Sequence, residues 1–156
     1  MSATDALAAD TVIDLLGLEP LADEGGLWAQ TLRDEHSTAI YYLMRPGDFS
    51  AMHRLTGTEV WHHYAGASVD MLLLDADGSI SRPRLGDDLL VGERPCVVVP
   101  SGVWMGAATT GAWSLVGTTM APRWEPDRFV LGDRARLRAE YPSAADDIDR
   151  LTRDRP

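Results

Sequence analysis

Short segments of strand-forming residues, separated by turns, run through most of the chain from residue 27 to residue 120. The expected strands are rich in β-branched, aromatic or long apolar residues and cover 27–33, 37–45, 58–65, 69–74, 96–99 and 112–120. Turn residues gather between them at 45–48, 75–78, 92–95 and 109–111. Many closely spaced short strands favour a sandwich or barrel, and the lack of helical patterns between them argues against a parallel βαβ sheet.

Both ends of the chain carry helical patterns. Val12, Leu15 and Leu16 share one helical face with Ala8, and Leu137 lies one turn before Tyr141 near the other end. A length of 156 residues predicts one domain, 1–156. We expect an N-terminal helical segment over 1–22, a β core over 24–124, C-terminal helices over 133–152 and a solvated tail from 152 to 156.

Composition excludes some classes of function. The chain has 24 acidic and 14 basic side chains, a formal charge of −10, whereas a nucleic-acid binder needs a basic surface. Cys96 is the single cysteine, cannot form an internal disulfide, and is expected to be an inert buried thiol in a strand. No signal-peptide pattern opens the sequence, and the apolar runs are too short to span a bilayer. These features predict a cytoplasmic protein with neither nucleic-acid nor membrane partners.

One stretch has a specific spacing of potentially functional residues. Gly47 is followed after five residues by His53, and Glu59 is followed after six residues by Gly66. This spacing resembles the first motif of the cupin superfamily, except that Leu55 stands where that motif has a second histidine. More narrowly, the chain resembles the cupin-5 or DUF985 group from about residue 16 to residue 141. The matching blocks are 24–26, 38–43, 46–50, 53–54, 59–62 with Tyr64 and Gly66, 74–78, 92–95, 99–104 and 121–122.

The resemblance implies a fold and an assembly. It implies an all-β cupin double-stranded β-helix, the jelly roll, with short N- and C-terminal helices. It also implies a homodimer, because cupins commonly pair through sheet edges and unpaired edges need covering.

Two positions depart from the group's pattern. Met105 stands where a histidine or glutamine is expected in the second motif, and Arg123 stands where glycine is usual.

The motif and strand alternation together predict a cavity. If Glu59 points into the barrel, Trp61 and His63 point in with it, while Val60, His62 and Tyr64 point outward. The expected substrate-binding residues are Trp61, His63, Met105, Trp104, Tyr42 and Arg54. They would line a mainly apolar cavity around His53 and Glu59, which suits a small organic ligand.

The metal chemistry of typical cupins is in question. Their sites offer three histidines and a carboxylate to a transition metal, and Leu55 and Met105 remove two of these ligands here. We therefore expect no tightly bound metal and no other cofactor. If a divalent ion does bind weakly, His53, Glu59 and His63 are the expected ligands, and a metal-dependent enzyme such as an oxygenase remains an alternative.

Metal-free acid–base catalysis is the leading hypothesis. Cupins of the sugar-epimerase type use a histidine with a tyrosine, so the resemblance implies His53 as base, with Tyr41, Tyr42 or Tyr64 as acid. We take Tyr41 as the first choice, together with Glu59, whose pKa burial can raise. The expected reaction is isomerisation, epimerisation or cyclisation of a sugar or natural-product intermediate. A non-catalytic ligand-binding cupin is the alternative, and Glu59 could instead form a structural ion pair with Arg54 or Arg33.

Overall fold

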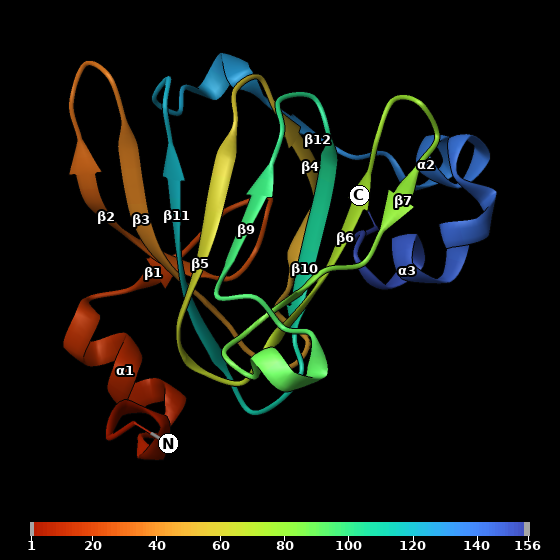
Figure 1. The fold of residues 1–156 in the computed structure, drawn as a ribbon. Coiled ribbons are helices and arrows are strands. Elements are labelled where there is room, and N and C mark those ends of the chain that lie inside the picture. The colour runs from red at the N-terminus through yellow and green to blue at the C-terminus, as the bar shows by residue number, and fades with distance from the viewer. Residues whose placement is uncertain (1, 155–156) are drawn as a thin grey trace.

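The computed structural model describes residues 2–154 and contains two antiparallel sheets that face each other (Figure 1). In spatial order, the first sheet contains β1 (Glu19–Pro20), β2 (Leu27–Arg33), β3 (Thr38–Met44), β11 (Ser114–Met120), β5 (Glu59–Gly66) and β9 (Cys96–Val99). The second contains β12 (Phe129–Leu131), β4 (Ser50–Leu55), β10 (Trp104–Thr109), β6 (Val69–Leu74) and β7 (Ile80–Ser81), and β8 (Arg84–Leu85) also pairs with β6. The all-β jelly-roll prediction is confirmed.

Short helices lie at both ends of the chain and in its loops. They are η1 (Thr4–Ala6), α1 (Ala9–Leu16), η2 (Leu89–Val91), η3 (Pro126–Arg128), α2 (Arg134–Glu140), η4 (Pro142–Ala144) and α3 (Ala145–Arg150). Gly17 ends α1 in the left-handed conformation, at φ 63°, which a residue without Cβ adopts readily. Among residues 2–154, no helix is both long and apolar enough to cross a membrane.

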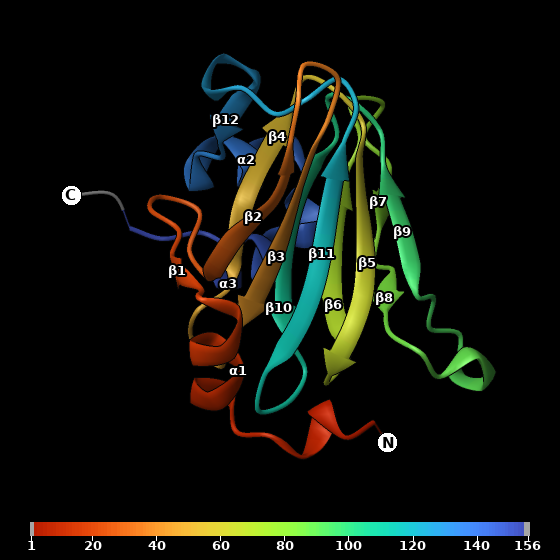
Figure 2. The ribbon, with the colours of Figure 1, turned by 90° about the vertical axis from the view of Figure 1, so that its left-hand side faces the viewer.

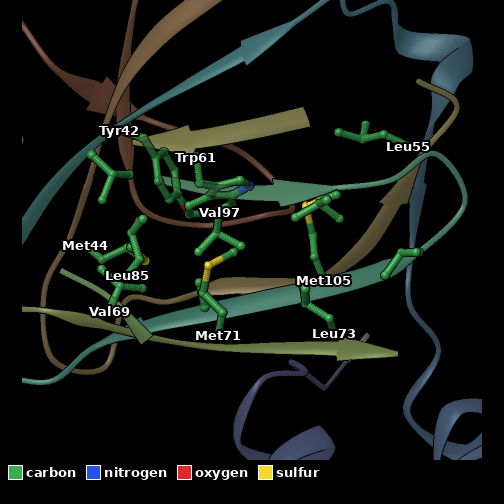
Figure 3. Close-up of a cluster of buried hydrophobic side chains, with 14 of the residues drawn as sticks. Tyr42, Met44, Leu55, Trp61, Val69, Met71, Leu73, Leu85, Val97 and Met105 are labelled. Carbon is green, nitrogen blue, oxygen red and sulfur yellow. The ribbon is translucent and has the colours of Figure 1, made fainter. Parts of the chain in front are cut away.

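Strand alternation divides the apolar side chains into three clusters. The inner faces of both sheets form the central core, which includes Tyr42, Trp61 and Met105 (Figure 3). The outer face of the first sheet is covered by α1 through residues such as Val12, and the outer face of the second is covered by α2 and α3 through residues such as Leu137. Adjacent residues of one strand therefore belong to different clusters.

Two expectations about exposure are wrong. Cys96 is exposed, because alternation in β9 turns Val97 and Val99 inward and leaves Cys96 and Val98 on the outside. The predicted solvated tail is packed at its start, whereas Asp154, the last described residue, is exposed. Thr152 is buried, and the backbone N–H of Met52 in β4 donates to the Leu151 carbonyl just before it. Residues 155 and 156 lie outside the described residues.

Candidate functional site

A cavity of about 440 Å³ lies between the two sheets, toward the end that carries the β2–β3 turn and residues 124–129. Its volume is in the range of small-molecule sites. The apolar core fills the interior beside it, as the packed side chains in Figure 3 show. The cavity is lined by Leu21, Ala22, Asp23, Glu24, Trp28, Gln30, Arg33, Thr38, Ile40, Tyr42, His53, Leu55, Glu59, Trp61, Thr118, Trp124, Pro126 and Phe129.

Glu59 is the carboxyl group of the cavity whose pKa is clearly shifted. It begins β5, is only 7% exposed, and its Oε2 accepts a hydrogen bond of 3.0 Å from Trp61 Nε1. Burial raises the pKa of Glu59 to about 7, an effect that Glu24 strengthens and that His53 and the hydrogen bonds from Thr118 and Trp61 oppose. Glu59 can therefore both hold and release a proton near neutral pH.

His53 is fixed in one orientation by its own strand. Its Nδ1 lies 2.7 Å from the carbonyl oxygen of Ala51, and a carbonyl only accepts, so the proton is on Nδ1. Its Nε2 lies on the cavity side of the ring, 3.9 Å from Glu24 Oε1. The ring is 2% exposed and stacks on Phe129 with centroids 5.3 Å apart. In its neutral form His53 thus presents the Nε2 lone pair as a base.

Glu24 is a site residue that sequence reasoning missed, because two glycines follow it and the pattern there indicates a turn. Its side chain is 16% exposed and accepts a 2.7 Å hydrogen bond from Ser50 Oγ. Its backbone carbonyl accepts from Ala51 N–H at 2.9 Å and from Arg153 Nη1 at 2.6 Å. The signal that could have found Glu24 is its place in a block, 24–26, that matches the resembling group.

Four of the predicted site residues line the cavity together: His53, Glu59, Trp61 and Tyr42. Tyr42 comes from β3 and Glu59 and Trp61 from β5, both in the first sheet, whereas His53 comes from β4 in the second. Tyr42 donates a 2.6 Å hydrogen bond to the Gly25 carbonyl, and burial raises its pKa well above the usual value. The predicted inward orientations of Glu59 and Trp61 are confirmed by their burial.

Three predicted residues lie on outer faces, and the expectation that they line the cavity is wrong. Tyr41 alternates with Tyr42 in β3, so its ring points to the outer face and meets Tyr64 edge-on at 6.1 Å. Trp104 packs under the C-terminal helices, and the Arg54 guanidinium lies 4.7 Å from the centre of its ring. These three outward positions follow from the alternation of side chains along a strand, in which successive residues point to opposite faces of the sheet.

Two further predicted residues do not line the cavity. Met105 pairs with His53 across β10 and β4 and is 1% exposed within the central core. His63 lies two residues beyond Trp61 along β5, and its Nε2 is 3.2 Å from the Ala67 carbonyl oxygen. The expectation that they line the cavity is wrong because the core cluster occupies that level of the barrel.

The donor set does not fit the metal centre that typical cupins carry. Within the described part of the chain, no three His, Cys, Asp or Glu side chains come together in a way that could hold a metal ion. The alternative ligand set of His53, Glu59 and His63 is contradicted, because His63 does not reach the cavity. Leu55 lines the cavity where a second motif histidine would stand, and its side chain has no atom that can bind a metal.

Comparison with known proteins supports the family assignment. The model of the Cupin superfamily (DUF985) family matches residues 10–132. The crystal structure of protein SO0799 from Shewanella oneidensis is 34% identical, with a TM-score of 0.90 over 96% of this chain and 99% of that one. A hypothetical protein from Leishmania major is 24% identical, with a TM-score of 0.87 over 95% and 100% of the two chains.

More distant structures share the fold. A variant of oxalate decarboxylase OxdC from Bacillus subtilis is 13% identical, with a TM-score of 0.59 over 86% of this chain and 37% of that one. No curated protein matches the chain. Because the family model covers most of the sequence, the predicted resemblance is confirmed, and the chain belongs to the DUF985 family of the cupin superfamily.

Proposed function

We propose that this protein is a small-molecule enzyme of the isomerase, epimerase or cyclase class, acting by acid–base chemistry in the barrel cavity. The observation that carries the proposal is the pairing of His53 with Glu59, whose pKa is raised to about 7, in the same largely apolar cavity. A sugar or natural-product intermediate is the proposed substrate, within a biosynthetic role in the cytoplasm. The single cysteine and the net charge of −10 are compatible with that compartment.

The roles of the two groups follow from their geometry. His53 Nε2 accepts a proton from a carbon or hydroxyl of the substrate, because Nδ1 is held by the Ala51 carbonyl. Glu59 in its protonated form donates a proton to the other side of the reacting group. Solvent then reprotonates Glu59 and takes the proton from His53, so both groups return to their starting states. Glu24, 3.9 Å from His53 Nε2, stabilises the imidazolium that forms.

The assignment of the acid differs from the sequence-based hypothesis. Tyr41 points away from the cavity, and the hydroxyl proton of Tyr42 is engaged with the Gly25 carbonyl. Burial also raises the pKa of Tyr42, which makes it a weaker acid. Glu59 takes the place of the tyrosine in this proposal because it titrates near the working pH.

A proton-exchange screen tests the proposal even though the substrate is unidentified. Sugars, nucleotide sugars and hydroxy-ketones are incubated with the protein in D₂O, and deuterium incorporation is followed by ¹H NMR. We expect exchange at one carbon of at least one compound. His53→Gln and Glu59→Gln should slow that exchange by about 10²-fold or more.

Matched variants control for general damage. His62→Gln changes a histidine of the Glu59 strand whose Nε2 is 3.1 Å from Thr119 Oγ1, and Glu35→Gln changes a carboxylate that is 83% exposed. Both should leave exchange unchanged. Compounds that bind in the cavity without any exchange would support the non-catalytic alternative instead, and loss of exchange on chelation with recovery by one ion would support metal dependence.

A further inference from the structure

Aromatic rings make up much of the cavity wall. The lining includes Trp28, Tyr42, Trp61, Trp124 and Phe129. Tyr42 and Trp61, which lie side by side in Figure 3, meet edge-to-face with centroids 6.0 Å apart and an interplanar angle of 83°. Ring faces carry negative partial charge, and a compact cation gains from lying against several of them at once.

The charges around these rings are predominantly negative. Glu24, Glu59 and Asp23 supply three carboxyl groups to the lining. Against them stand two groups with a positive form among the described lining residues, His53 and Arg33. The guanidinium of Arg33 is already engaged, because it donates to Glu125 Oε2 and to the Trp124 carbonyl, each at 3.1 Å. The lining therefore carries more acidic than basic side chains, which favours a positive guest.

We infer that the cavity selects small organic cations, such as an ammonium-bearing substrate, over neutral molecules of the same shape and over anions. The inference deepens the proposed function and rests on it only for the reaction, since binding is tested separately. An ammonium group lies against the rings of Trp28, Tyr42 and Trp61 and is balanced by the Glu24 carboxylate and by Glu59 in its ionised form. An anion of equal size faces the Glu24 carboxylate and the ionised form of Glu59, both partly desolvated, and is rejected.

Three probes of nearly identical shape isolate the effect of charge. Choline is the cation, 3,3-dimethylbutan-1-ol replaces its nitrogen by carbon, and 3,3-dimethylbutanoate carries a negative charge. All three fit easily within about 440 Å³. Binding is followed through the indole N–H resonance of Trp61 in ¹⁵N-labelled protein, because that group donates to Glu59 inside the cavity.

The expected order of affinity is choline, then the alcohol, then the carboxylate, with at least a tenfold preference for choline over the alcohol. Glu59→Gln should reduce this preference several-fold, because the charge is lost while a hydrogen-bond acceptor for Trp61 is kept. Trp28→Leu should weaken the binding of choline more than the binding of the alcohol, because leucine is apolar but has no aromatic ring face. Circular dichroism of each variant checks that it is folded.

Several outcomes would overturn the inference. Equal or tighter binding of the alcohol or the carboxylate would do so, as would a Trp61 resonance that no probe shifts. An unchanged preference for choline in both variants would place the cation elsewhere. None of these results affects the outcome of the deuterium-exchange screen, because that screen uses other compounds. Failure of the cation preference can therefore be distinguished from failure of the proposed function.

Discussion

At the scale of single residues, the candidate site depends on the environment of one carboxyl group, that of Glu59. Glu59 is held away from water, and its nearest ionisable neighbours, His53 and Glu24, act on its pKa in opposite directions. The resulting pKa of about 7, against 4.5 for an ordinary glutamate, means that the folded state retains a proton that the unfolded chain releases. The proposed catalytic role and a cost in stability therefore come from the same burial.

Glu59→Gln should make the protein more stable at alkaline pH. Below about pH 4.5 Glu59 is protonated in both states; between 4.5 and about 7 only the folded state holds the proton, so stability falls as pH rises. The rise of the pKa from 4.5 to about 7 corresponds to at most about 3 kcal/mol. Between pH 4.5 and pH 8, urea unfolding should show that the free energy of unfolding of the variant rises relative to that of the wild type by up to this amount. Equal pH dependence of the two proteins would mean that Glu59 is not perturbed.

Metal removal should have little effect on the wild type. The described residues bring no three potential ligands together, and the motif position of Leu55 is apolar. We expect that dialysis against a chelator leaves the melting temperature within about 1 °C, whereas a structural metal would contribute far more. Elemental analysis of untagged protein before dialysis is the companion measurement, and a stoichiometric transition metal would contradict this prediction.

At the scale of secondary structure, strand alternation decided which predicted residues reach the cavity. Tyr42 and Met105 turn inward, and their neighbours Tyr41 and Trp104 turn outward onto helices. The six strands expected from the sequence were found with small shifts in their ends. The two-residue strands β1, β7 and β8 and the longer β4, β10 and β12 were missed. β10 contains Gly106 and two alanines, whose weak strand propensity is overcome by pairing with β4 and β6.

The C-terminal tail supports the loop that carries Glu24. Arg153 donates to the Glu24 carbonyl at 2.6 Å and to the Phe49 carbonyl at 2.8 Å, and it lies 4.0 Å from the centre of the Phe49 ring. Asp48 accepts from the backbone N–H of Gly26 at 2.8 Å, on the other side of the same loop. The C-terminal tail and the turn before β4 thus hold one wall of the cavity.

Arg153→Ala should loosen this loop and lower the free energy of unfolding by about 1–3 kcal/mol, because two backbone carbonyls lose a charged donor. Arg153→Lys should retain only part of the lost stability, because an ammonium group cannot donate two hydrogen bonds in the forked geometry of a guanidinium. Chemical denaturation measures the change, and hydrogen exchange of the Ala51 amide reports the loop. Arg150→Ala, at a side chain 75% exposed, serves as the control and should be near neutral. Equal effects of the two alanine variants would rule out a specific role for Arg153.

At the scale of the whole molecule, one edge of the first sheet carries exposed apolar residues. β9 ends that sheet with Val98 55% exposed, and the preceding η2 exposes Leu90 at 98% and Val91 at 69% (Figure 2). An unpaired edge with apolar side chains favours association. We propose that this edge pairs with the same edge of a second copy, forming the homodimer that the family resemblance implies.

Replacing the apolar groups at this edge should separate the two copies. Leu90→Asp combined with Val98→Asp should shift the protein from dimer to monomer in size-exclusion chromatography with light scattering, because like charges then face each other across a two-fold axis. Leu15→Asp, at a residue 72% exposed on α1, should leave the dimer intact. A wild type that is monomeric at tens of micromolar, or a double variant that stays dimeric, would refute the proposed interface.

The sequence alone determined the class of fold, most strands of the first sheet, the family and the central pair of site residues. These features depend on local periodicity and on a spacing of glycines, His53 and Glu59 that is visible in one dimension. Only the tertiary structure decided that Glu24 joins the site, that Tyr41, His63 and Arg54 do not, and that the C-terminal tail packs against it. The physical reason is that a cavity lining is set by strand register and by which layer covers each face, and both depend on contacts between residues far apart in the chain.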